Sequence, residues 1–174
     1  ALPICYGYTG GPHPLAYRGL GELFVILFFG FVAVLGTAFV QSGEWYQDAL
    51  VAGLQIGALS TVLIAINNLR DVSEDRTTGK RTLAVRFGET FARWEILALI
   101  GTAHLAGLHW WLQGDYNAFT YPLILLPVGL WISFGTFTSS PGPVYNRYLA
   151  FSGLHLLLFA LLLSVGLASH APAS

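Results

Sequence analysis

The sequence contains no methionine, only one cysteine and few charged residues. With Cys5 alone, the chain cannot form an internal disulfide. Charged residues make up 10% of the sequence, whereas a typical soluble domain has about 25%. The net charge of −1 gives no indication of nucleic-acid binding. Because no methionine stands at its start, we expect residue 1 to be an internal position of a longer chain.

Charge is absent over long runs of the sequence. These runs are 23–43, 49–69, 96–114, 116–146 and 148–174. A membrane-spanning helix needs about 20 apolar residues, and each run can hold one. We therefore predict an all-α integral membrane protein with a single membrane domain and about five transmembrane helices. The expected spans are 22–40, 48–66, 95–113, 119–138 and 147–168. A soluble protein would have to leave these helices with almost no polar face for water.

The basic residues predict how the chain sits in the membrane. If the five spans cross in turn, every basic residue falls on the same side. They are Arg18, Arg70, Arg76, Lys80, Arg81, Arg86, Arg93 and Arg147. Basic residues in short loops mark the cytoplasmic side. We therefore expect the loop 67–94 to face the cytoplasm.

That loop opens with "NNLRDVSEDRTTGKRTLAVR", residues 67–86, where charge is concentrated. Asn67, Asp71 and Asp75 follow one another at intervals of four. They share one face if the second span continues as a helix, and Asn68 lies beside them. Two carboxylates and an amide oxygen form an all-oxygen site, which suits Mg²⁺ completed by water and substrate phosphates. We therefore predict Asn67, Asp71 and Asp75 as metal ligands.

Basic residues follow these acids closely. Thr77, Thr78 and Gly79 are expected to break the helix, and Lys80 and Arg81 come directly after the break. Together with Arg70, they are the side chains that reach phosphate oxygens, so the segment predicts a diphosphate site.

Two simpler interpretations of the segment remain open. It is also explained as a positive-inside loop with balancing acids, or as a set of ion pairs along a helix. A phosphate-binding P-loop is excluded, because Glu74 stands where that motif needs a glycine.

The segment "NNLRDVSEDRTTGKRTLAVRFG" resembles the second aspartate-rich motif of the UbiA superfamily of membrane prenyltransferases. It is most similar to the branch that acts on 1,4-dihydroxy-2-naphthoate in menaquinone biosynthesis. The stretches "YTGGPHPLAYRGLGE", "FFGFVAVLGT" and "YNRYLAFSGLHLLLFALLLSVGL" resemble the same branch in the same order. The resemblance covers essentially the whole chain, and its central motif is long and specific.

The resemblance implies a Mg²⁺-dependent aromatic polyprenyltransferase in a bacterial inner membrane. Its partners would be polyprenyl diphosphate, dihydroxynaphthoate and the lipid bilayer, and decarboxylating transfer would give demethylmenaquinol. The chain matches the later helices of the family. The N-terminal helices, with the first aspartate-rich motif, would be missing, so that an isolated fragment would be inactive.

The resemblance also gives roles to individual residues. Asp71, Asp75 and Lys80 are the predicted catalytic residues. Asn67, Asp71 and Asp75 would hold the metal, and the predicted diphosphate contacts are Asn68, Arg70, Lys80 and Arg81. Tyr8 and Tyr17 would help to cover the site.

Two other functions remain open from the sequence. One is a related prenyltransferase with another aromatic acceptor. The other is a non-enzymatic membrane module whose basic loop binds anionic lipid. Loss of activity in aspartate variants would favour an enzyme, whereas sensitivity confined to Lys80 and Arg81 would favour lipid binding. Elsewhere, Gly53 and Gly57 are four residues apart and predict close helix packing rather than chemistry.

Overall fold

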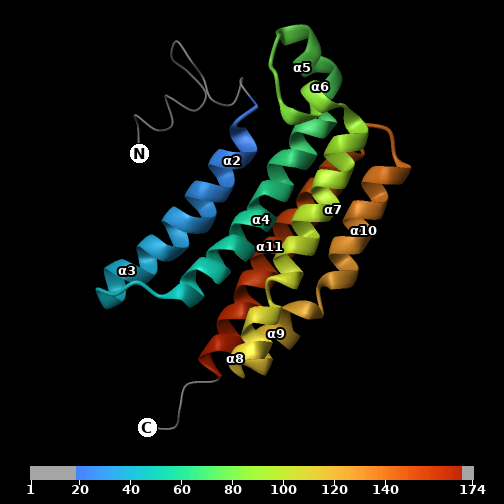
Figure 1. Ribbon diagram of the computed structural model, residues 1–174. Coiled ribbons are helices and arrows are strands. Elements are labelled where there is room, and N and C mark those ends of the chain that lie inside the picture. Colours follow the sequence, from blue (N-terminus) through green and yellow to red (C-terminus); the bar gives the residue numbers. More distant parts are fainter. Residues whose placement is uncertain (1–18, 170–174) are drawn as a thin grey trace.

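The computed structural model describes residues 19–169 of the protein, and within them every regular element is a helix (Figure 1). Tyr8 and Tyr17 lie outside the described residues. The helices in the first part of the chain are α2 (Gly21–Val25), η2 (Ile26–Leu35), α3 (Gly36–Ser42), α4 (Gln47–Arg70), α5 (Val72–Thr78) and α6 (Leu83–Phe87). They are followed by α7 (Glu89–Leu105), α8 (Leu108–Gln113), α9 (Tyr116–Leu123), α10 (Leu126–Thr138) and α11 (Tyr145–Ala168). The all-helical fold predicted from the sequence is confirmed.

Three helices are long and apolar enough to cross a membrane. The first runs from Gly21 to Ser42 and consists of α2, the wider π-helical turns of η2, and α3. The other two are α4 and α11. They coincide with the first, second and fifth expected spans. The first helix ends at Gly43, whose φ of 75° is left-handed and accessible to glycine at little cost.

The remaining two expected spans are interrupted. The third, 95–113, is divided between α7 and α8 by a turn at Ala106 and Gly107. The fourth is built from α9 and α10, which are bent by 41° after Pro122 and count as one span only if taken together. By length and composition the described residues thus offer three spans, or four with the bent pair. The five-span topology stays a prediction.

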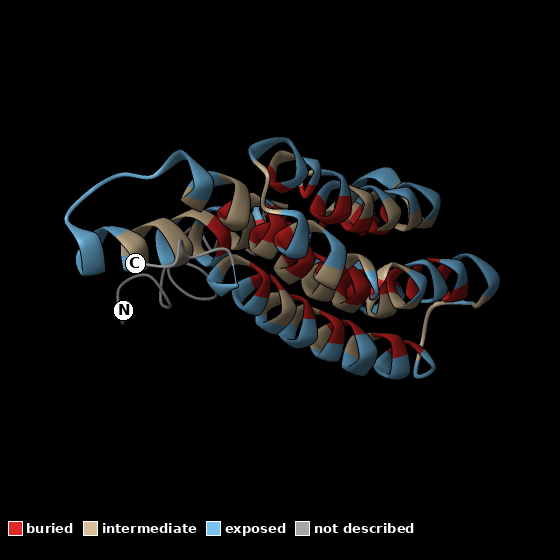
Figure 2. Ribbon diagram, turned by 90° about the horizontal axis from the view of Figure 1, so that it is seen from below, coloured by how far each residue is buried: buried red, intermediate tan, exposed pale blue. Residues whose placement is uncertain are grey.

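Helix α4 is the central helix of the bundle. Half of its most apolar stretch is buried, compared with 6% for the first helix. Figure 2 shows buried residues on the inner faces of the packed helices and exposed residues on the outside of the bundle. It meets the first helix at glycines: a Cβ on Gly53 would lie 3.0 Å from the carbonyl oxygen of Gly30, and a Cβ on Gly57 3.0 Å from Gly30 Cα. The close packing predicted for Gly53 and Gly57 is therefore confirmed.

Buried side chains on α4 join it to the other helices in two clusters. Nearer the α5 end, Ile66 and Leu69 pack with Ile96, Ile132 and Tyr145. Toward the other end, a second cluster combines Ala58, Leu59, Trp110, Phe159 and Leu163.

A buried hydrogen-bond network links α4 to α7 and α8. Gln55 donates to the Ala103 carbonyl at 2.8 Å and accepts from Trp110 Nε1 at 2.8 Å. The contacts of α4 with α7 and α8 are thus fixed within the apolar core.

That charged end lies beside several other helix termini. Figure 1 shows α5 and α6 at one end of the bundle, where α2, α7 and α11 begin and α10 ends. Residues far apart in the sequence, from Glu22 to Asn146, therefore meet around the segment 67–81.

Candidate functional site

The segment 67–81 keeps a helical course through its two aspartates. Helix α4 ends at Arg70, and Asp71, with φ −96° and ψ 10°, joins it to α5. The backbone N–H of Asp71 still donates to Asn67 at 3.1 Å, and that of Asp75 to Asp71 at 2.8 Å. Helix α5 ends at Thr78, and Gly79 is left-handed. The helix break predicted for Thr77, Thr78 and Gly79 therefore falls at Gly79, whereas the two threonines still belong to α5.

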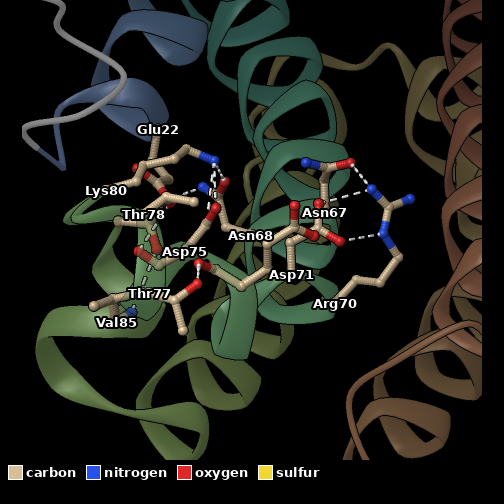
Figure 3. Close-up of polar contacts among 12 residues, drawn as sticks. Glu22, Asn67, Asn68, Arg70, Asp71, Asp75, Thr77, Thr78, Lys80 and Val85 are labelled. Carbon is tan, nitrogen blue, oxygen red and sulfur yellow. Dashed lines mark hydrogen bonds and ion pairs between the residues drawn. The ribbon is translucent and has the colours of Figure 1, made fainter.

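The first polar group of the site is centred on the Arg70 guanidinium (Figure 3). It donates to both carboxylate oxygens of Asp71, at 2.7 and 2.8 Å, and to Asn67 Oδ1 at 2.9 Å. It also donates to Asn146 Oδ1 at the start of α11, at 2.7 Å. The hydrogen bonds from Arg70 hold the pKa of Asp71 below its usual range.

The second polar group is centred on Lys80 (Figure 3). Its Nζ lies 3.1 and 3.3 Å from the carboxylate oxygens of Asp75, which is buried, and 3.5 Å from Asn68 Oδ1. Asn68 Nδ2 donates to Glu22 Oε1 at 2.7 Å. The group thus joins α2, α4, α5 and the turn that follows α5.

The predicted metal ligands are divided between these two groups. Asn67 and Asp71 belong to the first and Asp75 to the second, and each carboxylate is paired with its own basic residue. No set of three or more acidic, histidine or cysteine side chains within residues 19–169 is placed to share a metal ion. The ligand set Asn67, Asp71 and Asp75 therefore stays a prediction.

The residues predicted to contact diphosphate differ in whether other side chains hold them in place. Asn68, Arg70 and Lys80 lie in the polar groups, whereas Arg81 is exposed. Glu74, also exposed, projects from α5 beside Asp75. It is therefore a neighbouring acid against which the role of Asp75 can be compared.

An apolar groove of about 460 Å³ begins beside the first polar group and is open on one side. It runs between the first helix, α4 and α11. Its lining residues are Val25, Phe29, Ser60, Leu63, Ile64, Asn67, Leu149 and Leu156. Asn67 and Ser60 are its only polar residues, so a ligand here would have a polar end near Asn67 and an apolar remainder.

Sequence reasoning missed two members of the site, Glu22 and Asn146. Glu22 is 5% exposed and one of its carboxylate oxygens, Oε2, has no hydrogen-bond partner. Its position as the last acid before the chargeless run 23–43 was an available signal. Asn146 carried no such signal, because its partner Arg70 is 76 residues away.

Comparison with known proteins places these residues in context. Residues 1–143 match the model of the UbiA prenyltransferase family. The 1,4-dihydroxy-2-naphthoate octaprenyltransferase of Escherichia coli is 42% identical over 49% of this chain and 28% of its own length. The Mycobacterium tuberculosis protein of the same name is 44% identical over 55% of this chain and 33% of its own.

A human relative is more distant. UbiA prenyltransferase domain-containing protein 1 is 34% identical over 49% of this chain and 25% of its own length. The chain thus spans about a third or less of these relatives. No solved structure matches it.

Proposed function

Because the chain belongs to the UbiA prenyltransferase family, we propose that it is part of an enzyme that transfers a polyprenyl group from polyprenyl diphosphate to an aromatic acceptor. The acceptor is 1,4-dihydroxy-2-naphthoate, and the product is demethylmenaquinol. The names of the relatives support this choice of acceptor. One structural observation carries the proposal: a cluster of acids and bases lies at the head of an apolar groove. Asn67 connects the two, because it accepts a hydrogen bond from Arg70 and also lines the groove.

The basic residues of the site would hold the diphosphate. Arg70 and Lys80 are fixed by contacts to Asp71 and Asp75. Arg70 also bonds Asn67 at the head of the groove, and Lys80 lies in the neighbouring polar group, beside Asn68. Their positive charge would stabilise the negative charge that collects on diphosphate as the allylic carbon–oxygen bond breaks. Arg81, being exposed, would contribute a weaker contact.

The donor set fits a divalent cation such as Mg²⁺. Asn67, Asp71 and Asp75 offer oxygen atoms only, as a hard cation prefers, and water and substrate phosphates would complete the shell. When bound, Mg²⁺ would supply positive charge to the departing diphosphate. The first aspartate-rich motif, on helices outside this chain, would provide the facing half of the site.

The groove would receive the hydrocarbon chain of the donor. Phe29, Leu63 and Leu156 line it, and burial of apolar surface stabilises by about 25 cal/mol per Å². With its diphosphate at Arg70 and Lys80, the donor would present its allylic carbon near Asn67. A ring carbon would form a bond to the allylic carbon there, and the electron pair of the broken allylic carbon–oxygen bond would leave with diphosphate. The bond between the ring and its carboxylate would break as CO₂ leaves, and its electron pair would stay in the ring.

The proposal also fixes a location for the site. The basic end of the bundle would face the cytoplasm of a bacterial cell, at the inner membrane, where water-soluble acceptor arrives.

The test is an assay of the full-length protein in membranes. Dihydroxynaphthoate, a labelled polyprenyl diphosphate and Mg²⁺ are supplied, and decarboxylated prenyl-naphthoquinol is measured. Asp71→Ala and Asp75→Ala should each lower the rate by at least about a hundredfold, the scale of losing one stabilising group. Glu74→Ala, an exposed acid in the same segment, should leave it unchanged.

Each alternative has its own outcome. Binding of polyprenyl diphosphate without product would keep the donor and discard the acceptor. A third outcome would favour a lipid-binding membrane module. In that case there is neither product nor Mg²⁺-dependent binding of polyprenyl diphosphate, and the protein binds anionic vesicles in a way that is lost in Lys80 and Arg81 variants.

A further inference from the structure

Glu22 is a buried carboxylate that the proposed reaction does not yet use. It lies on α2, 5% exposed, directly before the first chargeless run. Only one of its oxygens is bonded, to Asn68 Nδ2 at 2.7 Å, and Oε2 has no partner. A buried polar atom without a hydrogen-bond partner is costly, so the position calls for an explanation beyond helix packing.

The bond from Glu22 fixes the orientation of the Asn68 amide. A carboxylate can only accept a hydrogen bond and an ammonium group can only donate one. Asn68 must therefore turn Nδ2 toward Glu22, which leaves Oδ1 toward Lys80 Nζ, at 3.5 Å. Figure 3 draws the three side chains, which come from α2, α4 and the turn after α5.

Lys80 is thus held from two directions. Asp75 bonds its Nζ from α5, and Asn68 approaches it from α4. The group contains two carboxylates, Glu22 and Asp75, but one ammonium. If a cation binds the carboxylate oxygens of Asp75, as the proposed function requires, Lys80 loses its contact to Asp75 and keeps its contact to Asn68.

We infer that Glu22 is a positioning residue for the donor diphosphate: it orients Asn68, and through Asn68 it holds the Lys80 ammonium group in place. This inference rests on the proposed function, because it assigns Lys80 to the diphosphate. Glu22 itself touches neither substrate nor metal. Its role is to keep the ammonium group in place when Asp75 no longer pairs with it.

The opposing explanation is a purely structural role for Glu22. In that case Glu22 joins α2 to α4 through one buried hydrogen bond, and its loss weakens the fold without selecting between substrates. Donor affinity separates the two explanations, because loss of a purely structural contact would weaken binding of the donor and of the acceptor alike.

The experiment compares Glu22→Ala and Glu22→Gln in the full-length protein in membranes, with Glu44→Ala as an exposed acidic control. The equilibrium binding of a polyprenyl diphosphate is measured, together with KM for donor and for dihydroxynaphthoate. Glu22→Ala should weaken donor binding and raise donor KM about tenfold, the scale of a hydrogen bond to a charged group, with acceptor KM unchanged.

Glu22→Gln should restore donor binding to within about twofold of the wild type, since its carbonyl oxygen can still accept from Asn68. Unchanged donor binding in Glu22→Ala, or equal losses for donor and acceptor, would overturn the inference and leave the proposed function standing. Equal damage in Glu22→Gln and Glu22→Ala would also overturn it, since charge rather than orientation would then matter. A wild-type protein that does not bind polyprenyl diphosphate would overturn both.

Discussion

Lys80 Nζ lies 3.1 Å from one carboxylate oxygen of Asp75 and 3.3 Å from the other, so a single ammonium group serves both oxygens of a buried acid. This pair closes the C-terminal end of α5, because the backbone N–H of Lys80 also donates to the Asp75 carbonyl at 3.0 Å. The turn at Gly79 brings the two side chains together. The same residues are those expected to meet a diphosphate and its cation.

Removing Lys80 should therefore destabilise the fold as well as weaken donor binding. Lys80→Met leaves Asp75 buried without its cation, and we expect a loss of about 1–3 kcal/mol in unfolding free energy, less than for a fully buried pair because Lys80 is part-exposed. Asp75→Leu in addition should recover most of it. Chemical unfolding in detergent of the two single variants and the double variant measures the coupling between Lys80 and Asp75. Losses of unfolding free energy that simply add would contradict the coupling. Arg81→Met, at an exposed position, is the control.

The Arg70–Asp71 pair should give stability a defined pH dependence. Asp71 has a lowered pKa in the folded protein because of hydrogen bonds from Arg70, relative to an ordinary value of 3.8. Its contribution is therefore complete above that value and is lost as pH falls through the folded pKa. Thermal unfolding of wild type and Asp71→Asn should differ by a constant amount above about pH 5 and converge in acid. A gap that persists unchanged in acid would contradict the assignment.

The glycine contact between the first helix and α4 should be intolerant of a methyl group. A Cβ on Gly30 would meet the Gly53 carbonyl oxygen and lie 2.9 Å from Gly57 Cα. Gly30→Ala should cost about 1–3 kcal/mol of unfolding free energy, as overpacking does. Gly36→Ala, on the same helix with nothing within 4 Å of the added carbon, should be neutral or stabilising. Equal effects of the two substitutions would show that backbone propensity, not the helix contact, decides.

Filling the groove should affect long donors more than short ones. Leu63 lines the groove on α4, and Leu63→Trp would occupy part of its volume. We expect KM for a long polyprenyl diphosphate to rise about tenfold or more, with a smaller change for dimethylallyl diphosphate, whose chain ends near the polar site. Leu161→Trp, on an exposed face of α11, is the matched control. A similar change for both donors would place the hydrocarbon chain elsewhere.

The helices could be predicted from the sequence because their signals are local. Chargeless runs located the first helix, α4 and α11, and Gly79 located the end of α5. The break at Ala106 and Gly107 was missed, since hydropathy alone does not distinguish one long apolar helix from two short ones in line.

The composition of the candidate site was predicted better than its pairing. A spacing of four residues placed Asn67, Asp71 and Asp75 on one helix face, but it carries no information about which base each acid meets. Arg70 reaches its immediate neighbour Asp71 because its side chain is long enough to fold back along the helix end. Glu22 and Asn68 are 46 residues apart, and only the packing of α2 against α4 brings them together.

Because the groove is open on one side, the relevant concentration of the proposed donor would be its concentration in the bilayer rather than in water. The groove's lining of Phe29, Leu63 and Leu156 would let the hydrocarbon chain of the proposed donor enter sideways from the surrounding lipid, without first passing through water. Transfer through water would cost about 0.8 kcal/mol for each methylene group. If the groove holds the donor as proposed, the mole fraction of donor in the bilayer would set the occupancy of the groove, and added lipid would lower that occupancy by dilution.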